Sequence, residues 1–538
     1  MTVFSECAAA RLLRWFREKG GTLYQNSVLG RTAAAFSGSW PQSRTKRLWE
    51  GFLNRESGAE SSLYGRGLAA LHRLCLRLGL WLLPLLHQSL LYRAGTAVKR
   101  FFGRLLRGSA LCRLWTAGKM DFRRLVIVVF SLYLPVHWLM RDVLPVGALA
   151  SVWDELFFIA AALYVVWLRV SERDWDGRPH ATALDMPILL FCAAGFLLMC
   201  INSPVPSIAL AGYRATVQYI LWFFVMVRLV RDEGDIRALC GGIAAVGFLM
   251  ALHGIVQFIL AVPIPDSWTT QAEADVRTRA FSITGSPNIL GAYLVMTAPL
   301  FAGFAYTAKK LFWKLAAWAA VGAEMLCLLA TYSKGAWVGM VCAVLLFAVL
   351  HDRKIFALAA VGVSGALFIP SITTRIQFLF TDDFAEASAV GGRSMRWERG
   401  RELLASDPWR GFGLGRFGGA VAMQNQYLEV TEEFEYFYLD NYYLKIAVEM
   451  GYPGIIVFAA LVLALLWQGV RACGRALHTS IAPLTAGILS GLTGVLVHCF
   501  FENIFEEPYM MALFWGLAAA LIAAPRLLRT GKDTEEST

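Results

Sequence analysis

The 538-residue sequence has little charge, with Asp, Glu, Lys and Arg making up 17% of it. Soluble globular domains carry about 25% charged residues. Hydrophobic residues account for 57% of the chain, and the mean hydropathy is +0.53. This composition excludes a soluble globular protein and predicts an integral membrane protein, and the 18 Trp residues fit belts at membrane–water interfaces.

The sequence also lacks metal-ligand spacings. Its ten cysteines are scattered, and no CxxC or Cys/His pattern occurs. We interpret them as small packing residues and predict no disulfide framework, no metal site and no cofactor. No nucleic-acid-binding motif is present either, so no nucleic-acid partner is predicted.

Positive charge is concentrated before the first long apolar run. Residues 1–124 contain 21 Lys and Arg against 6 Asp and Glu, a net charge of +15, whereas the whole chain has +11 and the remainder therefore −4. A basic block of this kind is typical of a cytoplasmic anchor obeying the positive-inside rule. The first twenty residues predict an amphipathic surface helix.

Apolar runs long enough to cross a bilayer follow Arg124. They predict an all-α integral membrane protein with about 12 transmembrane helices, centred near 125–140, 149–168, 185–201, 213–230, 236–262, 287–307, 311–331, 334–350, 354–371, 440–470, 481–500 and 508–525. An earlier run, 68–91, contains Arg73 and Arg77 and is interrupted by Pro84. An arginine at the bilayer centre costs about 2.5–3.5 kcal/mol, so we predict that this run is interfacial or re-entrant.

The loops indicate the orientation of these spans. Every second loop and the tail are basic, whereas 202–213 has no charge and 501–508 carries three acids and no base. The sequence therefore predicts a large extracytoplasmic loop between spans 9 and 10. The predicted parts are 1–120, a basic cytoplasmic or interfacial extension; 121–371, spans 1–9; 372–439, the loop; 440–526, spans 10–12; and 527–538, a cytoplasmic tail.

Basic residues on the predicted outer side need an explanation. They include Arg279 and Lys334 beside span-end turns, and Arg393 and Arg396 in the large loop. They either reach lipid headgroups, pair with acids of the loop, or bind an anion. In a helical "GRSMRWERGRELL", Arg393 and Arg396 share a face, and arginine recognises phosphate through two parallel hydrogen bonds. A lipid-linked pyrophosphate and a simple anion both suit this pattern.

Two further stretches contain residues suited to binding or catalysis. In "FSITGSPNILGAYLVMTAPL" (281–300), Ser286 can cap a helix that Pro287 opens, which makes either a well-capped span or an anion site. At the predicted outer face, Asp440 opens the tenth span and His498 ends the eleventh. Each is either structural or a general base for an acceptor hydroxyl, and Glu449 within the tenth span needs a partner.

Four motifs together resemble the O-antigen ligase and polysaccharide polymerase superfamily of the Wzy-C type. They are "RAFSITGSPNILGAYLVMTAPL" (279–300), "TYSKGAWVG" (331–339), "GGRSMRWERGRELLASDPWRGFGLGRF" (391–417) and "DNYYLKIAVEMGYPG" (440–454). The resemblance covers about residues 120–526. Two departures stand out: Lys334 replaces an arginine of the family pattern, and Asp440 replaces a histidine found in the ligases.

The resemblance implies a glycosyltransferase in the inner (cytoplasmic) membrane of a bacterium. It would be metal-independent and inverting, and would transfer a glycan from undecaprenyl pyrophosphate to an acceptor glycan, lipid or protein on the extracytoplasmic side. The family pattern implies that Arg279, Lys334, Arg393 and Arg396 bind the pyrophosphate. Asp440 or His498 would then act as the base, and ligase and polymerase remain open alternatives.

Two other classes of function fit the sequence less well. A transporter for a small anion such as bicarbonate would show inverted repeats and charges on broken helices near the midplane, and no clear repeat is present. A non-catalytic membrane scaffold would use the basic N-terminus to recruit a partner.

Overall fold

The computed structural model describes residues 61–90, 121–171, 181–265, 278–368, 393–429 and 436–535, with a few isolated positions besides. The chain divides into two units, 1–56 and 57–538, and all that follows concerns the second. The predicted amphipathic helix over the first twenty residues lies outside the described residues, as does most of the predicted 1–120 extension. The described part of the chain is helical and contains no strand.

The bounds of the helices are α4 Leu63–Gln88, α7 Phe122–Ser131, α8 Tyr133–Trp138, η3 Leu139–Val143, α9 Leu149–Ser171, α10 Asp185–Ile201, α11 Pro206–Val217, η5 Gln218–Leu221, α12 Trp222–Leu229, α13 Glu233–Ile259, η8 Ser282–Thr284, α14 Pro287–Thr307, α15 Leu311–Ala330, α16 Lys334–Leu350, α17 Lys354–Leu367, α20 Arg393–Ser406, α21 Ala420–Asn425, α22 Tyr442–Ala476, α23 Ala482–His498, η9 Ile504–Glu506 and α24 Pro508–Glu535.

Every predicted span coincides with one or more of these helices. By length and composition alone, eight helices in the described residues can cross a membrane, or nine if α7 and α8–η3, which are bent by 69°, form one span. The apolar helices α10, α16 and α23 are shorter than the eight. The fold is thus an all-helical membrane protein with about eight or nine candidate spans, and the count of 12 stays a prediction.

The core of the second unit is formed by α14, α23 and α24, whose side chains are almost all buried. α23 packs on α14 through glycines: a Cβ at Gly487 would lie 2.4 Å from the Pro299 carbonyl oxygen, and one at Gly491 would lie 2.5 Å from that of Met296. Small residues allow such close approach of helices in a membrane, where van der Waals packing rather than the hydrophobic effect drives helix association.

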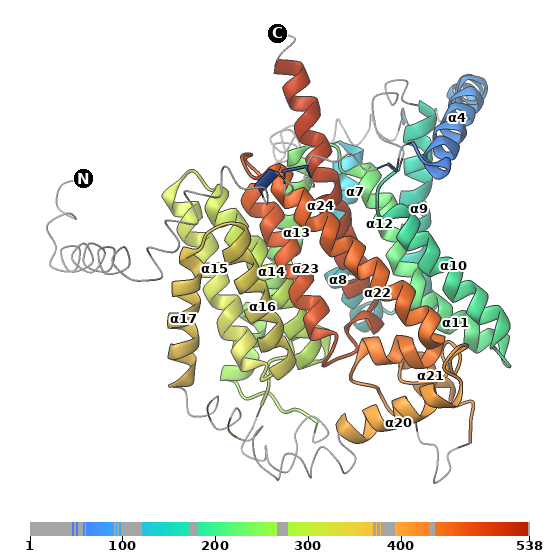
Figure 1. Ribbon diagram of the computed structural model, residues 1–538. Helices are drawn as coiled ribbons and strands as arrows, with labels where there is room; N and C mark the ends of the chain where they lie inside the picture. The colour runs from blue at the N-terminus through green and yellow to red at the C-terminus, as the bar shows by residue number, and fades with distance from the viewer. Residues whose placement is uncertain are drawn as a thin grey trace, which may run out of the picture. The chain divides into compact units, whose positions relative to one another are not determined.

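The bundle has two distinct ends (Figure 1). We call the end with α20 and α21 the loop end, and the other end, where α7 lies and α12 meets α13, the opposite end. The helices α14, α16 and α22 begin at the loop end, and α13, α15 and α23 begin at the opposite end.

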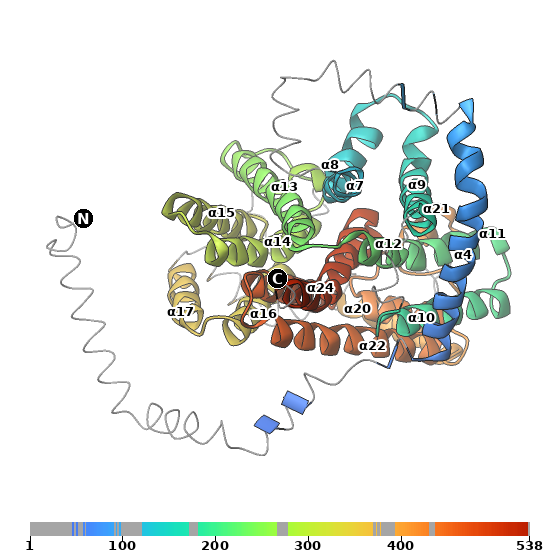
Figure 2. The same ribbon diagram turned by 90° about the horizontal axis from the view of Figure 1, so that it is seen from above.

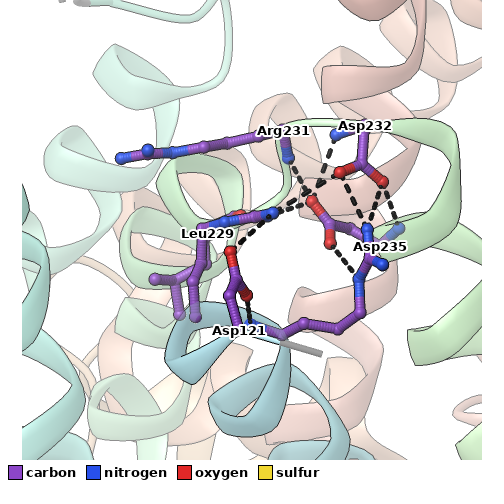
Figure 3. A network of polar contacts seen from close by, with 7 residues as sticks. Asp121, Leu229, Arg231, Asp232 and Asp235 are labelled. Atoms are coloured by element: carbon purple, nitrogen blue, oxygen red, sulfur yellow. Dashed lines mark hydrogen bonds and ion pairs between the residues drawn. The ribbon is translucent and has the colours of Figure 1, made fainter. Parts of the chain in front are cut away.

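A saturated charge network fixes the opposite end (Figure 3). The Asp232 side chain accepts from the Asp235 backbone N–H and the Asp235 side chain accepts from that of Asp232, which forms a capping box at the start of α13. Arg124 bonds to both aspartates at 2.8 and 3.0 Å, and Arg123 bonds to Asp235 and to the Leu229 carbonyl oxygen. Arg123 also pairs with Asp121 at 3.4 Å, so two arginines meet three aspartates, and α7 is tied to α13.

Helix α4 differs from its prediction in one respect. Pro84 was expected to interrupt the run at 68–91, but the helix continues through Pro84 to Gln88. It is also one of the eight helices that could span a membrane by length and composition. Its contacts, treated below, bear on its orientation.

Candidate functional site

The site begins with a carboxylate between two arginines. Asp440 precedes α22, and the side chain of Asn441 caps that helix by accepting the Leu444 backbone N–H at 3.0 Å. The Asp440 Oδ2 atom lies 3.0 Å from Nη1 of Arg396 and 3.9 Å from Nε of Arg393. As the sequence predicts, "GRSMRWERGRELL" is helical from Arg393, and Arg393 and Arg396 share a face.

These two arginines retain capacity for a ligand. Their side chains are 41% exposed for Arg393 and 32% for Arg396, and that of Asp440 is 19% exposed. Nη2 of Arg393 also donates to the Phe501 carbonyl oxygen at 3.0 Å. Nε of Arg396 is buried and has no hydrogen-bond partner within the described residues. Two guanidinium groups therefore share a single carboxylate on a half-exposed surface.

Arg279 reaches the same region through Asn288. Its Nε donates to the Thr331 carbonyl oxygen at 2.9 Å, and its Nη2 lies 3.4 Å from Oδ1 of Asn288. Asn288, in the first turn of α14, donates through Nδ2 to the Glu502 carboxylate. The beginning of α14, the end of α15 and the segment after α23 are thereby joined in one polar chain.

Lys334 and His498 lie where α16 begins against the end of α23. Nε2 of His498 is 3.5 Å from Oγ of Ser333, the residue before Lys334. A Cβ at Gly335 would lie 2.6 Å from Cβ of Phe501 and 2.8 Å from Cδ2 of His498. His498 is only 1% exposed. The ring therefore packs against the turn that carries Lys334 and the start of α16.

Glu502 is the second carboxylate of the site. Burial raises its pKa, the negative charge of Asp440 raises it further, and the Asn503 N–H, Asn288 and Arg393 oppose the rise. A carboxyl group with a raised pKa is a better proton acceptor when ionised than an ordinary one. Glu502 is thus a further candidate for acid–base chemistry beside Asp440.

The glycine-rich segment after α20 fits into a break in α22. At Gly451 the helix has φ 65° and ψ −172°, so its hydrogen-bond ladder is interrupted there. The backbone N–H groups of Phe412 and Gly413 bond to the carbonyls of Val448 and Glu449 at 2.7 and 3.1 Å. The Tyr452 N–H in turn donates to the Pro408 carbonyl oxygen at 2.7 Å. The segment therefore satisfies groups that the break would leave unpaired.

Only glycine suits the tightest point of this contact. Gly411 has φ +76°, and a Cβ there would lie 2.5 Å from the Gly451 nitrogen and 2.6 Å from the Glu449 carbonyl oxygen. The break in α22 lies at Gly451, and the segment that follows α20 is held against it.

The partner that Glu449 was expected to need is Lys445, whose Nζ lies 2.8 Å from its carboxylate. The other Glu449 oxygen accepts the backbone N–H of Gly415 at 3.0 Å. Lys445 also pairs with Glu506 at 2.9 Å, and Glu506 accepts the Ala420 N–H at 3.0 Å. This buried network ties both sides of the glycine segment to α22 and to the segment before α24.

Other arginines of the loop end have local partners. Arg410 pairs with Asp407 at 2.7 Å and holds the pKa of that carboxyl below its usual range. Arg416 donates to the Phe412 carbonyl oxygen at 2.7 Å and lies 4.5 Å above the Phe412 ring. Neither contacts Asp440. Both arginines therefore have structural roles within their own segment.

The structure thus gathers the six predicted site residues, Arg279, Lys334, Arg393, Arg396, Asp440 and His498, at the loop end. Sequence reasoning missed the connecting roles of Asn288 and Glu502, whose signals were the Pro-Asn pair in 281–300 and the acids in 501–508. The predicted side-chain cap by Ser286 is wrong, whereas Pro287 does open α14. No group of three or more His, Cys, Asp or Glu in the described ranges is placed to hold a metal ion.

Residues 315–459 match the family model described as O-antigen ligase. The match runs from α15 into α22, and it includes Lys334, Arg393, Arg396 and Asp440, while Arg279 and His498 lie outside it. The predicted relationship to the O-antigen ligase family is thereby confirmed. A comparison with curated proteins finds no match. The domain and the apolar helices together indicate a bacterial membrane protein with a glycosyltransferase-like role in polysaccharide assembly.

Proposed function

We propose, on the premise of an O-antigen ligase domain, that this protein transfers a glycan from undecaprenyl pyrophosphate to an acceptor glycan or lipid. The observation that carries the proposal is the pair Arg393 and Arg396 sharing Asp440. Two partly exposed arginines whose ion pairs are both with the same carboxylate suit a multiply charged anion. Arg279 and Lys334 close by would bind the same pyrophosphate.

The proposed transfer takes place outside the cytoplasmic membrane of a bacterium, at the loop end. With a cytoplasmic N-terminus and 12 spans, residues 372–439 lie on the extracytoplasmic side. The charges at the helix ends support it, since Arg169, Arg228, Lys310 and Arg353 all lie at helix ends or in connections away from the loop end.

In the proposed reaction an acceptor hydroxyl attacks the anomeric carbon of the glycan, and the bond to the lipid pyrophosphate breaks. Attack opposite the leaving group inverts the anomeric configuration. The pyrophosphate departs with its negative charge, which the four cationic side chains would stabilise without requiring a metal ion. The proton of the hydroxyl passes to a base.

We assign the base to Asp440. Its side chain is 19% exposed and lies beside both arginines, whereas His498 is 1% exposed and contacts the turn before Lys334. When a pyrophosphate engages Arg393 and Arg396, their bonds to Asp440 would weaken and free the carboxylate for an acceptor hydroxyl. His498 would then position the start of α16.

Surface glycan assembly in a deletion strain tests the proposal. Arg279→Ala and Arg396→Ala should each abolish assembly while the protein still inserts, because transition-state charge stabilisation of this kind supplies about 10²–10³ in rate. Arg410→Ala is the matched control, since Arg410 is exposed and pairs with Asp407. Normal glycan in both site variants would overturn the proposal.

A paired substitution tests the base. Asp440→Asn should remove transfer and Glu502→Gln should reduce it less, in membranes supplied with lipid-linked donor and acceptor. The opposite order would assign proton transfer to Glu502. Equal activity of Asp440→Asn and wild type would exclude Asp440.

One observation suits a transporter instead: α22 is broken at Gly451 beside the Lys445–Glu449 pair. The carbonyls freed by the break are, however, bonded to the glycine segment, as described above. Uptake of labelled bicarbonate into proteoliposomes distinguishes the two functions, and we expect none above empty vesicles.

A further inference from the structure

Helix α4 contacts the opposite end of the bundle at two places along its length. The Tyr64 hydroxyl, in its first turn, interacts with Asp185 and Arg228. Asp185 is the first residue of α10, and Arg228 lies in the last turn of α12. Fifteen residues later, a Cβ at Gly79 would lie 2.6 Å from the carbonyl oxygen of Val170, near the end of α9.

These contacts determine the orientation of α4. An α-helix rises about 1.5 Å per residue, so about 22 Å separate Tyr64 from Gly79 along its axis. A helix that crossed the membrane would carry these two residues to different depths of the bundle. Both instead meet helix termini at the opposite end, and Figure 2, which looks down on that end, shows α4 along its length beside α9 and α10.

One stripe of α4 faces the bundle and another is basic. The buried positions Gly65, His72 and Gly79 recur every seven residues. Arg66, Arg73 and Arg77 are all exposed. At about 100° per residue these arginines lie within about 40° of one another around the helix. The sequence of α4 contains no Asp or Glu, so no acid of its own neutralises the stripe.

A third stripe is apolar and exposed. Its members Leu71, Leu74, Leu78, Trp81 and Leu85 are between 47% and 66% exposed. A helix with a basic side and an apolar side suits the boundary between headgroups and acyl chains. In this position the leucines and Trp81 enter the acyl region while the arginines stay at the level of the phosphates.

We infer that α4 lies in the plane of the membrane at the opposite end of the bundle and that Arg66, Arg73 and Arg77 bind the headgroups of anionic phospholipids there. The charge complementarity of three exposed arginines without a neighbouring acid on the helix selects an anionic lipid over a zwitterionic one. In the proposed topology this surface belongs to the cytoplasmic leaflet, on the far side from glycan transfer. The lipid site itself is independent of that reaction.

Labelling tests the orientation. Leu63→Cys and Gln88→Cys place a thiol at either end of α4, and a membrane-impermeant maleimide is applied to sealed vesicles of one orientation, with the modified peptides identified by mass spectrometry. An in-plane helix exposes both positions to the same side. Labelling of the two positions from opposite sides would show that α4 crosses the membrane and would overturn the inference.

Lipid binding tests the arginines. Phosphatidylglycerol adducts on the full-length protein are measured by native mass spectrometry for the triple variant Arg66→Gln, Arg73→Gln, Arg77→Gln. The charge-matched control is Arg399→Gln, Arg401→Gln, Arg410→Gln at the loop end.

We expect the stripe variant to lose about tenfold or more in affinity and the control to change by less than about twofold. Phosphatidylcholine and inorganic phosphate serve as comparison ligands. Equal phosphatidylglycerol binding by both variants, or equal competition by inorganic phosphate, would overturn the lipid assignment. Neither readout depends on glycan transfer, so failure here is distinguishable from failure of the proposed enzyme activity.

Discussion

The two ends of the bundle use the same residue types in opposite ways. At the opposite end Arg123 and Arg124, whose side chains are largely buried, pair with the fully buried Asp235 and with the partly exposed Asp232. At the loop end two half-exposed arginines share Asp440. A buried pair is costly to open because its desolvated partner is left uncompensated. An exposed, underpaired group is cheap to rearrange, which suits a site that must exchange its own carboxylate for a ligand.

The comparison predicts its largest effect on stability at the opposite end. Asp235→Asn removes the buried negative charge that neutralises Arg123 and Arg124, and it should lower the free energy of unfolding by about 3–5 kcal/mol. Thermal unfolding in detergent measures this loss. Asp232→Asn is the matched control, because the Asp232 side chain is 47% exposed whereas that of Asp235 is 0% exposed. A loss as large for the control would contradict the role of burial.

The next effect concerns the glycine segment that fills the break in α22. Gly411→Ala would place a Cβ 2.5 Å from the Gly451 nitrogen at φ +76°. We expect a loss of about 1–3 kcal/mol in unfolding free energy from overpacking and backbone strain. Gly322→Ala is the control, since nothing lies within 4 Å of a Cβ there and Gly322 is inside α15. Unchanged stability of Gly411→Ala would mean that the segment can move away from α22.

A smaller effect depends on pH. Burial raises the pKa of Glu507, just before α24, from 4.5 to about 7. Between these values the folded protein binds more protons than the unfolded chain, so the free energy of unfolding falls as pH rises through this window and is lowest above pH 7. Because the side chain is partly exposed, we expect a fall of about 1–2 kcal/mol.

Thermal unfolding at pH values from 5 to 8 measures this fall, and Glu507→Gln should flatten it. Glu398→Gln, at an exposed position of α20, should keep the wild-type slope. If Glu507→Gln retains the full slope, other groups account for the pH dependence.

The smallest expected effect on stability is at the proposed site. Asp440→Asn removes the carboxylate shared by two half-exposed arginines, and we expect a loss below about 1 kcal/mol. Its glycan transfer should nevertheless be abolished. A stability loss equal to that of Asp235→Asn would show that the two clusters are alike and that the loop end is a structural network.

Much of the fold follows from composition and periodicity. Each of the apolar runs that predicted a span coincides with one or more helices of the structure. Apolar runs are a good guide because length and hydropathy decide whether a helix can reside in a bilayer. The number of spans is harder to predict. Helices such as α10 and α23 have 17 residues each, which is the lower limit of the about 17–25 residues that cross a bilayer.

The sequence alone also determined which residues to examine at the site. The four ordered motifs contain Arg279, Lys334, Arg393, Arg396 and Asp440, and the predicted end of the eleventh span at the outer face named His498. The contacts among them came only from the tertiary structure, because Arg396 and Asp440 are 44 positions apart and Asn288 and Glu502 are 214 apart. Sequence spacing cannot show which of two carboxylates faces an arginine when the partners lie on different helices.

The tertiary structure also decided the roles of residues that the sequence treated alike. Arg396 and Arg410 are both arginines of the glycine-rich loop, yet one reaches Asp440 and the other pairs with Asp407 three residues away. The glycines proved to be the means by which the segment approaches the broken helix α22. The sequence determined a membrane bundle with cations at one end, and packing determined which cations are left underpaired, since pairing depends on distances that only the folded chain sets.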